Sequence, residues 1–257
     1  MVVNVDSSII RASAIKFREI VSEKGLMGSA VTVSAKPLTT EEAIGNPVRR
    51  DYPLIAGRER ILEARFMGAR GHAFTDSPQN FEGILSEVLD LSADTNQNRA
   101  IYLAALNAVL RHLGLVRGTV HCRDEEPETC ARHIARHIKE TWGDCRVGLI
   151  GLNPAIADAL SRIFGSQNVW ITDRDRKNIG GQKYGITIRD GYTETEDLIK
   201  TSDLVLATGT TLGNGTFDVI WALIRKYHKP YLFYGVTVAG ISALMGVERI
   251  CPCGADA

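Results

Sequence analysis

The sequence has no excess of charge of either sign. Its 30 Lys and Arg residues balance 30 Asp and Glu residues, so the formal net charge at pH 7 is zero. Nucleic-acid binding needs a concentrated basic surface, and this balance therefore argues against a DNA or RNA partner. With 23% charged and 44% hydrophobic residues, the chain has the composition of a folded globular protein and not of a disordered one.

Long apolar segments are also missing. The longest apolar stretches, such as residues 147–152, fall far short of the ~18 residues that a membrane span needs. Arg11, Lys16 and Arg18 stand where a signal peptide would carry its apolar region, so the sequence predicts no export signal. We therefore expect a cytoplasmic protein that has no membrane partner.

Cysteine is scarce. Five cysteines are an odd number and too few to cross-link a chain of 257 residues, so we expect reduced thiols. Four of them form two pairs, Cys122 with Cys130 and Cys251 with Cys253. The fifth, Cys145, lies beside a predicted strand and is expected to be a buried structural thiol.

Residues 1–143 predict a smaller α+β domain with a helical connection. Helices are expected before Gly25 and over residues 81–91, 95–113 and 125–141, and strands at 28–36, 60–66, 71–75 and 118–122. Residues 39–57 are rich in charged and turn-forming residues, and they predict a long surface loop of a kind that is often functional.

After residue 143, strands and helices alternate at short spacing. In residues 144–257, strands are expected at 146–151, 168–172, 204–208 and 231–236, and helices at 154–164, 195–200, 217–227 and 241–245. This alternation predicts an α/β domain with a doubly wound parallel sheet. In such sheets, ligands bind beyond the carboxyl ends of the strands.

The end of the first of these strands carries a partial nucleotide-binding pattern. Gly151 forms the turn, Asn153 precedes a helix start, and Asp173 follows Gly151 by 22 positions (173 − 151). That spacing is near the ~20 residues expected for a carboxylate on a ribose hydroxyl, but the full G-x-G-x-x-G pattern is missing. The alternative is a plain strand-to-helix turn followed by a loop aspartate.

Residues 208–216 form a second such strand end. Glycines and a following helix N-terminus favour a bound carboxylate or phosphate, although turn and capping chemistry alone is an equal alternative. The segment lacks the Lys of a G-x-x-x-x-G-K-[ST] phosphate loop, which argues against ATP hydrolysis of that type. A third end, residues 234–240, has small residues that would let a ligand approach. The candidate ligands in the second end are Thr208, Gly209, Thr210, Thr211, Asn214 and Thr216.

Potential metal ligands are most concentrated in residues 121–130. His121, Cys122 and Cys130 offer imidazole and thiolate, the usual soft or borderline ligands of zinc and iron. If the C-terminal pair Cys251 and Cys253 meets them in space, the four thiols could hold zinc or an iron–sulfur cluster. The spacing of these residues matches no standard zinc-finger pattern.

Four other polar residues each have two interpretations. Asp124 and Glu125 could contribute to the same site, or they could simply form an acidic first turn that the helix dipole favours. His72 and Asp76 bracket a predicted strand, so either could act as a general base. A turn aspartate and a half-exposed histidine are the more common explanation for the second pair.

Several sequence blocks resemble a known family. They are GHAFTD at 71–76, AALNA at 104–108, TVHCRDEEPE at 119–128, ATGTTL at 207–212 and FYGVT at 233–237. These strings, with similarity running roughly from residue 28 to residue 254, look like those of a prokaryotic family described as "putative heavy-metal chelation". The resemblance implies an N-terminal domain similar to the enolase N-terminal fold, a Rossmann-like C-terminal domain and a cleft between them.

We therefore expect a metal-handling protein whose interdomain cleft holds a metal ion or a metal complex. Two alternatives stay open: a Rossmann-like enzyme that binds a nucleotide or adenosyl cofactor, and a non-catalytic protein that binds a small molecule. The expected partner is a small anionic ligand or metal complex, and a homodimer is an open alternative to a monomer. Whether the protein is an enzyme is not decided by its sequence.

Overall fold

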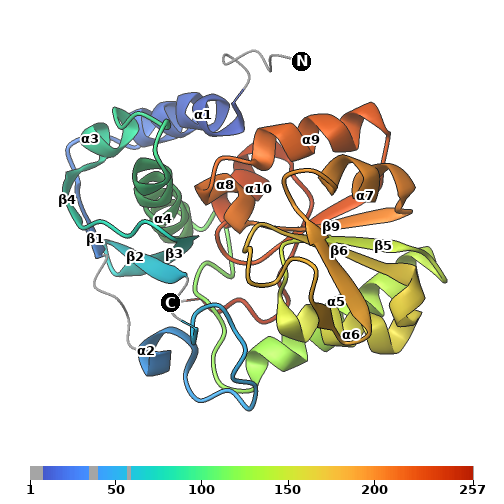
Figure 1. Cartoon of the computed structure of the whole chain (residues 1–257). Coiled ribbons are helices and arrows are strands. Elements are labelled where there is room, and N and C mark those ends of the chain that lie inside the picture. Colours follow the sequence, from blue (N-terminus) through green and yellow to red (C-terminus); the bar gives the residue numbers. More distant parts are fainter. Residues whose placement is uncertain (1–7, 35–39, 57–58, 257) are drawn as a thin grey trace.

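Two sheets lie side by side in the computed structural model, each with its own helices (Figure 1). The structure describes residues 8–34, 40–56 and 59–256. The first sheet is antiparallel throughout. Its strands, in spatial order, are β3 (Ala69–Thr75), β2 (Arg60–Phe66), β1 (Ala30–Ser34) and β4 (Phe81–Ile84).

The second sheet is parallel except at one edge. Its strands, in spatial order, are β11 (Arg249–Ile250), β10 (Tyr231–Tyr234), β9 (Leu204–Thr208), β5 (Val147–Ile150), β6 (Val169–Asp173), β8 (Ile186–Asp190) and the antiparallel β7 (Gln182–Lys183). The chain runs from β5 outward through β6 to β8, then returns to β9 and continues through β10 to β11. The direction of winding therefore reverses between β5 and β9, at the centre of the sheet.

Helices cover both faces of the second sheet (Figure 1). On one face, α5 (Glu126–Trp142) packs against α6 (Pro154–Phe164), which is followed by a 3-10 turn, Ser166–Asn168. The other face carries α7 (Thr195–Thr201), α8 (Thr210–Gly213), α9 (Phe217–Lys226) and α10 (Ala239–Met245). The predicted α/β fold with a parallel sheet is confirmed.

The first sheet shares a core with α1 (Ile9–Glu23), α3 (Leu85–Leu89) and α4 (Asn96–His112). The short α2 (Thr40–Ile44) stands apart from them (Figure 1). Helix α4 lies directly on β2 and β3. Gly71 permits this approach, because a Cβ atom there would lie 2.3 Å from the backbone nitrogen of Ala108.

Helix α4 also joins the two halves of the molecule. Its Asn107 is fully buried. The side-chain amide donates to the carbonyls of His72 (2.9 Å) and Val236 (3.0 Å), and its oxygen accepts from the amide of Gly240 (2.7 Å). These bonds tie β3 and the segment after β10 to the same helix, which gives the AALNA block a structural role.

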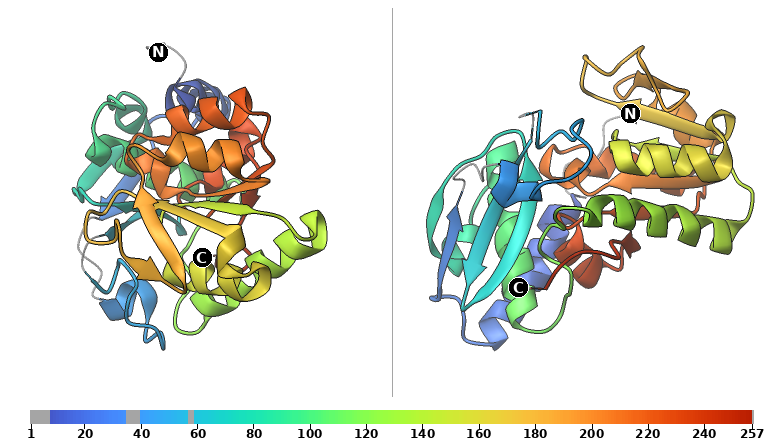
Figure 2. Two further views of the ribbon diagram at one scale, coloured as in Figure 1. Left: turned by 45° about the vertical axis from the view of Figure 1, so that its right-hand side comes forward. Right: turned by 90° about the horizontal axis from the view of Figure 1, so that it is seen from below.

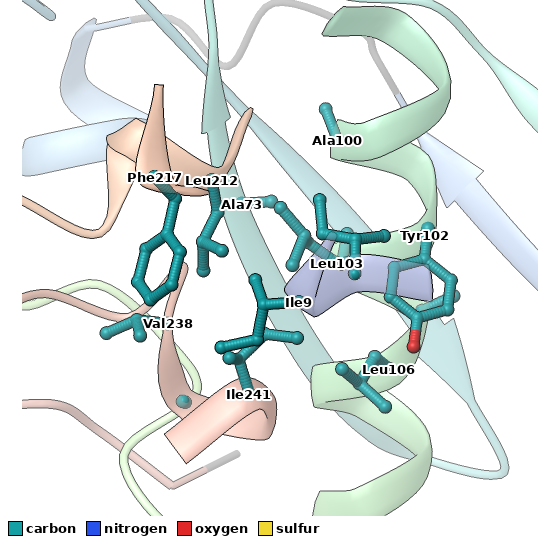
Figure 3. Close-up of a cluster of buried hydrophobic side chains, with 14 of the residues drawn as sticks. Ile9, Ala73, Ala100, Tyr102, Leu103, Leu106, Leu212, Phe217, Val238 and Ile241 are labelled. Carbon is teal, nitrogen blue, oxygen red and sulfur yellow. The ribbon is translucent and has the colours of Figure 1, made fainter. Parts of the chain in front are cut away.

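One apolar cluster runs through both halves (Figure 3). Leu103 and Leu106 of α4 lie close to Ile9 of α1 and Ile241 of α10. Phe217 of α9 belongs to the same buried cluster. A second cluster on the opposite face of the parallel sheet includes residues of α5 and α6. The predicted domain boundary between residues 143 and 144 stays a prediction.

The structure differs from the sequence prediction in several places, among them strand β7 and the short helices α2, in the predicted long loop, and α8, none of which was predicted. The helix expected over residues 81–91 is strand β4 followed by α3, because β4 pairs with β1 and Glu87 accepts from the amide of Ile84 where the helix begins. Strands β8 and β11 were not predicted. Residues 118–122 form no strand, only an isolated bridge between Val120 and Ala255. Residues 39 and 57, the ends of the predicted long loop, lie outside the described residues.

The C-terminal end of the chain returns to the first half of the molecule, as the view from below shows (Figure 2). Asp256 accepts a hydrogen bond of 2.6 Å from the amide of Gly118. Of the third predicted strand end, residues 234–237 line a cavity, whereas Gly240 packs against α4, where a Cβ atom would meet Leu106 at 2.7 Å. In the described part of the chain, no helix is long and apolar enough to cross a membrane.

Candidate functional site

A cavity of about 980 Å³ lies at the carboxyl ends of β5, β6 and β9, beside the reversal point of the sheet. Both halves of the chain line it, so it occupies the position predicted for a ligand cleft. Its volume is that of a site for a small organic molecule and far exceeds the space that one ion needs. The predicted site residues on its lining are Asp76, His121, Cys122, Cys130, Gly151, Asn153, Asp173, Thr208, Gly209, Thr210, Thr211, Asn214, Thr216 and Cys251.

Four cysteines meet at one wall of this cavity, and we call them the thiol cluster: Cys122, Cys130, Cys251 and Cys253. The thiol of Cys130 interacts with those of Cys122 and Cys251, and Cys253 interacts with Cys130. Cys130 is therefore at the centre of the group. The pairs from the middle and the end of the chain do meet in space.

The backbone explains how residues so distant in sequence come together. Val120 and Ala255 form an antiparallel bridge with two backbone hydrogen bonds of 3.1 and 2.9 Å. Two positions from this bridge, in opposite directions along the two segments, stand Cys122 and Cys253. The antiparallel register thus directs the two segments so that these cysteines approach one another.

Three thiols of the cluster, those of Cys130, Cys251 and Cys253, have raised pKa values. Contact with Cys122, together with burial, raises the pKa of Cys130 to about 12. The contact with Cys130 and burial also raise the pKa of Cys251 well above its usual value, and burial raises that of Cys253. The cause is that neighbouring thiolates would repel one another in a buried site, so a ligand must displace protons in order to bind here.

The cluster is a group of neighbours and not a finished coordination sphere. All five cysteines are free. Across residues 8–34, 40–56 and 59–256, no three His, Cys, Asp or Glu side chains are arranged to hold a metal ion. The remaining thiol, Cys145, is partly buried and belongs neither to the cluster nor to the cavity lining.

His121 presents a bare nitrogen in the cavity wall. Its Nδ1 is buried and has no hydrogen-bond partner. The ring donates to the backbone of Ala43, and this bond must come from Nε2 because Nδ1 is unpartnered. Burial, followed by the proximity of His72, lowers the pKa of His121 to about 4. The ring is therefore neutral at pH 7, and Nδ1 offers a lone pair.

His72 holds the backbone of His121 in place. Its Nδ1 accepts from the amide of His121 (3.1 Å), so Nε2 carries the proton and donates to Glu63 (3.0 Å). This bond is the main cause that lowers the pKa of Glu63 to about 2. His72 is buried and lies off the cavity lining. It therefore acts here as a positioning residue and not as the half-exposed base that the sequence allowed.

Two further polar residues beside the cluster were missed from the sequence. The hydroxyl of Tyr52 and both carboxylate oxygens of Glu128 are buried without a hydrogen-bond partner. The two groups interact without reaching hydrogen-bond geometry, and burial, together with Glu128 and the nearby Cys122, raises the pKa of Tyr52. Tyr52 sits in the predicted long loop, and only its aromatic ring among charged neighbours could have drawn attention to it.

The second predicted binding segment, residues 208–216, we call the threonine loop. Its hydroxyls bond within the loop: Thr211 donates to the carbonyl of Thr208 (2.8 Å), and Thr216 donates to Asn214 (2.7 Å). Thr208 also donates to Thr210 (3.1 Å). Although these residues line the cavity, their side chains mainly stabilise the turn between β9 and α9. This favours the turn and capping interpretation over an anion site.

At the first predicted strand end, the polar side chains also make local hydrogen bonds. The side chain of Asn153 caps α6 by accepting from the amide of Ile156 (3.1 Å). One oxygen of Asp173 accepts from the amide of Leu152 (2.7 Å), and the other accepts from Asp175 (2.7 Å). Asp173 therefore ties the turn at Gly151 to the end of β6, and it keeps only part of its acceptor capacity for a ligand.

The cavity lining includes a carboxylate that the sequence analysis did not single out, Glu59. Burial, then the charges of Asp173 and Asp76, raise the pKa of Glu59 to about 7. For Asp76, burial raises the pKa, but hydrogen bonds from Asn96 and Ser77 outweigh it and the result is a lowered pKa. Asp76 is thus the turn residue that the sequence allowed as an alternative, although it also borders the cavity.

Asp124 and Glu125 are exposed and lie off the cavity lining. Asp124 accepts a hydrogen bond of 2.9 Å from the amide of Asn46. Glu125 precedes α5 and makes no side-chain cap. Their structural interpretation, as residues of the turn before α5, therefore describes them better than a role as ligands.

Comparison with known proteins bears on the family. Residues 136–251 match the model of a family, DUF364, whose description reads "Putative heavy-metal chelation". The predicted family resemblance is confirmed over those residues. Heavy-metal chelation is the description of the family, and three of the four cysteines of the cluster, Cys122, Cys130 and Cys253, lie outside the matched range. No curated protein matches the chain.

Two solved structures of the DUF364 family are similar to this chain, and both are titled as proteins of unknown function. One, from Pyrococcus horikoshii, is 15% identical with a TM-score of 0.53, over 90% of this chain and 80% of that one. The other, from Desulfitobacterium hafniense, is 16% identical with a TM-score of 0.46, over 72% of each chain. The first shows that this chain shares a fold with the Pyrococcus protein.

Proposed function

We propose that the protein binds a thiophilic metal ion, or a small complex of one, at the thiol cluster. The observation that carries this proposal is the contact of Cys130 with three other thiols that come from two distant parts of the chain. The family description, heavy-metal chelation, supports it. The large adjoining cavity supports a ligand that includes more than a bare ion.

The donor set fits a soft or borderline metal. Sulfur ligands select zinc, copper(I) or iron–sulfur clusters over magnesium and calcium, and the cluster offers thiols only. Cys122, Cys130, Cys251 and Cys253 would hold the ion, with the bare Nδ1 of His121 as a further donor nearby. A bound ion would supply positive charge that stabilises the thiolates, and binding would release their protons.

Anaerobic metal analysis tests the proposal. Protein purified without oxygen and titrated with zinc should bind about one equivalent, with an absorption spectrum that reveals any iron–sulfur cluster. A Cys122→Ser/Cys253→Ser double variant should lose this binding, whereas Cys145→Ser, which alters the thiol outside the cluster, should keep it. Binding well below one equivalent in the wild type, or equal binding in the double variant, would refute the proposal.

A second candidate is an enzyme that binds a nucleotide or adenosyl cofactor. The spatial order β8-β6-β5-β9-β10-β11 is the strand order of dinucleotide-binding folds, which favours the finer description of this half as Rossmann-like. The cavity adjoins the reversal point where such folds bind their ligands. Nucleotides and S-adenosylmethionine should then raise the melting temperature, and no shift with any of them would count against this function.

Other parts of the proposal follow from the same features. The free cysteines suit a reducing cytoplasm. The enclosed cavity suits a small ligand better than a nucleic acid, and a non-catalytic binding role accounts for it as well as an enzymatic one. Similarity of the first half to the enolase N-terminal fold and assembly into a homodimer remain expectations.

A further inference from the structure

Residues 45–56 pass from the first half of the molecule over the cavity, and we call them the strap. Two strap residues, Tyr52 and Leu54, are buried and line the cavity. They belong to the same apolar cluster as Cys130 and Ile134 of α5. The strap therefore covers the thiol cluster from one side.

One arginine fastens the strap to the second half. Arg49 donates to Asp158 of α6 (2.9 Å) and to the hydroxyl of Tyr184 in the turn between β7 and β8. That hydroxyl donates in turn to Asp51 of the strap (2.7 Å), and the guanidinium lies 5.0 Å from the centre of the Tyr184 ring. The side chains of Arg49 and Asp158 are only 21% and 22% exposed, so water screens this contact less than a surface ion pair.

The start of the strap is fixed at a tight turn. Gly45 has φ +69°, and a Cβ atom at this position would lie 2.2 Å from a carboxylate oxygen of Asp124. The same oxygen accepts from the amide of Asn46. This end therefore acts as an anchor, whereas the Arg49 contacts are side-chain hydrogen bonds that involve the backbone of neither sheet.

The closed strap carries an internal cost. It places the Tyr52 hydroxyl beside the two oxygens of Glu128, and all three atoms are buried without a hydrogen-bond partner. Unsatisfied buried polar groups oppose the closed state. A cation near Glu128 and the thiol of Cys122 would remove this cost, because it would interact with all of these lone pairs at once.

We propose that the strap is a gate over the thiol cluster, that Arg49 is its latch, and that a bound cation favours the closed form. The cation half rests on the proposed metal-binding function, whereas the latch half does not. A ligand can shift a two-state element only if it interacts more strongly with one state, and the Tyr52–Glu128 pair supplies that difference.

Thiol accessibility in the metal-free protein tests the latch. We expect Arg49→Ala to speed iodoacetamide labelling of Cys122 and Cys130, followed by mass spectrometry, by about tenfold or more, since partly buried charged hydrogen bonds are lost. Arg50→Ala is the matched control, because the exposed Arg50 donates to Asn46 within the strap and, among the described residues, makes no hydrogen bond to the second half of the molecule. This variant should leave the labelling rate unchanged. Cys145 provides an internal reference in every sample.

Two further measurements keep the result decisive. Tyr184→Phe keeps the ring and removes the shared hydroxyl, so it should speed labelling even if Arg49→Ala fails to fold. Labelling within twofold of the wild type in both latch variants, or an equal rise in Arg50→Ala, would overturn the latch.

Hydrogen exchange of residues 45–56 with and without zinc tests the cation half. Zinc should slow exchange in the wild type and slow it less in Glu128→Gln. If zinc binds and exchange is unchanged, the cation half is wrong. If no zinc binds, the proposed function and the cation half fail together, while the metal-free labelling still decides the latch.

Discussion

The thiol cluster and the threonine loop border the same cavity but use their polar groups in opposite ways. The cluster brings together residues that are over 100 positions apart, and bare donors such as His121 Nδ1 lie around it. The threonine loop is contiguous, and its hydroxyls bond to one another. A contiguous motif can thus satisfy itself, whereas a dispersed group keeps unpaired atoms that a ligand can use.

The largest expected effect on stability concerns Glu63, which accepts a hydrogen bond from His72 behind the thiol cluster. The ionised form of Glu63 is stabilised by His72, so its pKa is lowered to about 2 in the folded protein. A lowered carboxylate pKa stabilises the folded state above the unfolded pKa of about 4.5, and this is lost as pH falls towards 2. We expect Glu63→Gln to lower the free energy of unfolding by about 3 kcal/mol at pH 7.

Urea unfolding at pH 7 and at pH 3 measures this effect, and the difference between variant and wild type should shrink at the lower pH. Glu82→Gln, on the exposed edge of β4, should change neither value. An equal loss at both pH values would mean that packing, and not the charge of Glu63, supports the wall behind His121.

The next effect concerns the threonine loop. Arg99 of α4 donates to the carbonyl of Gly213 (3.0 Å) and to that of Ala93 (2.6 Å). Arg99→Ala should therefore lower the free energy of unfolding by about 2 kcal/mol, because charged hydrogen bonds to two carbonyls are lost. Arg117→Ala, an exposed arginine beyond the same helix, is the control. If Arg99→Ala lost ligand binding without losing stability, the threonine loop would be a ligand site and not merely a turn.

The substitution with the smallest expected effect on stability distinguishes most directly between the thiol cluster and the threonine loop. Thr211→Val keeps the shape of a buried side chain and removes its bond to Thr208. We expect a loss of about 1 kcal/mol in thermal or urea unfolding and unchanged zinc binding. A variant that is as stable as the wild type but binds its ligand more weakly would show that the loop, and not the cluster, contacts the ligand.

Most elements of the fold could be predicted from the sequence. Periodicity located α4, and the alternation of strands and helices gave the parallel sheet. Strand β8 was missed because it is short and lies between polar turns. Its buried residues are Ile186 and Ile188. Residues 81–91 looked helical from their local pattern. The pairing of β4 with β1 depends on a partner that is distant in sequence, and a local pattern does not show it.

The candidate site was predictable in its residue types but not in its assembly. Cysteine pairs are visible in the sequence, yet their meeting depends on the Val120–Ala255 bridge, which no local pattern encodes. The side chains of Asn153 and Asp173 show a related limit of the sequence. Their side chains bond nearby amides, and the same residue types would serve a ligand equally well.

The Val120–Ala255 bridge also bears on the order of events during folding. Strands β5 to β10 can pair before residues 251–255 dock, because none of those strands needs them. Cys122 and Cys130 therefore form half of the thiol cluster on a largely folded scaffold, and the docking of residues 251–253 completes the cluster.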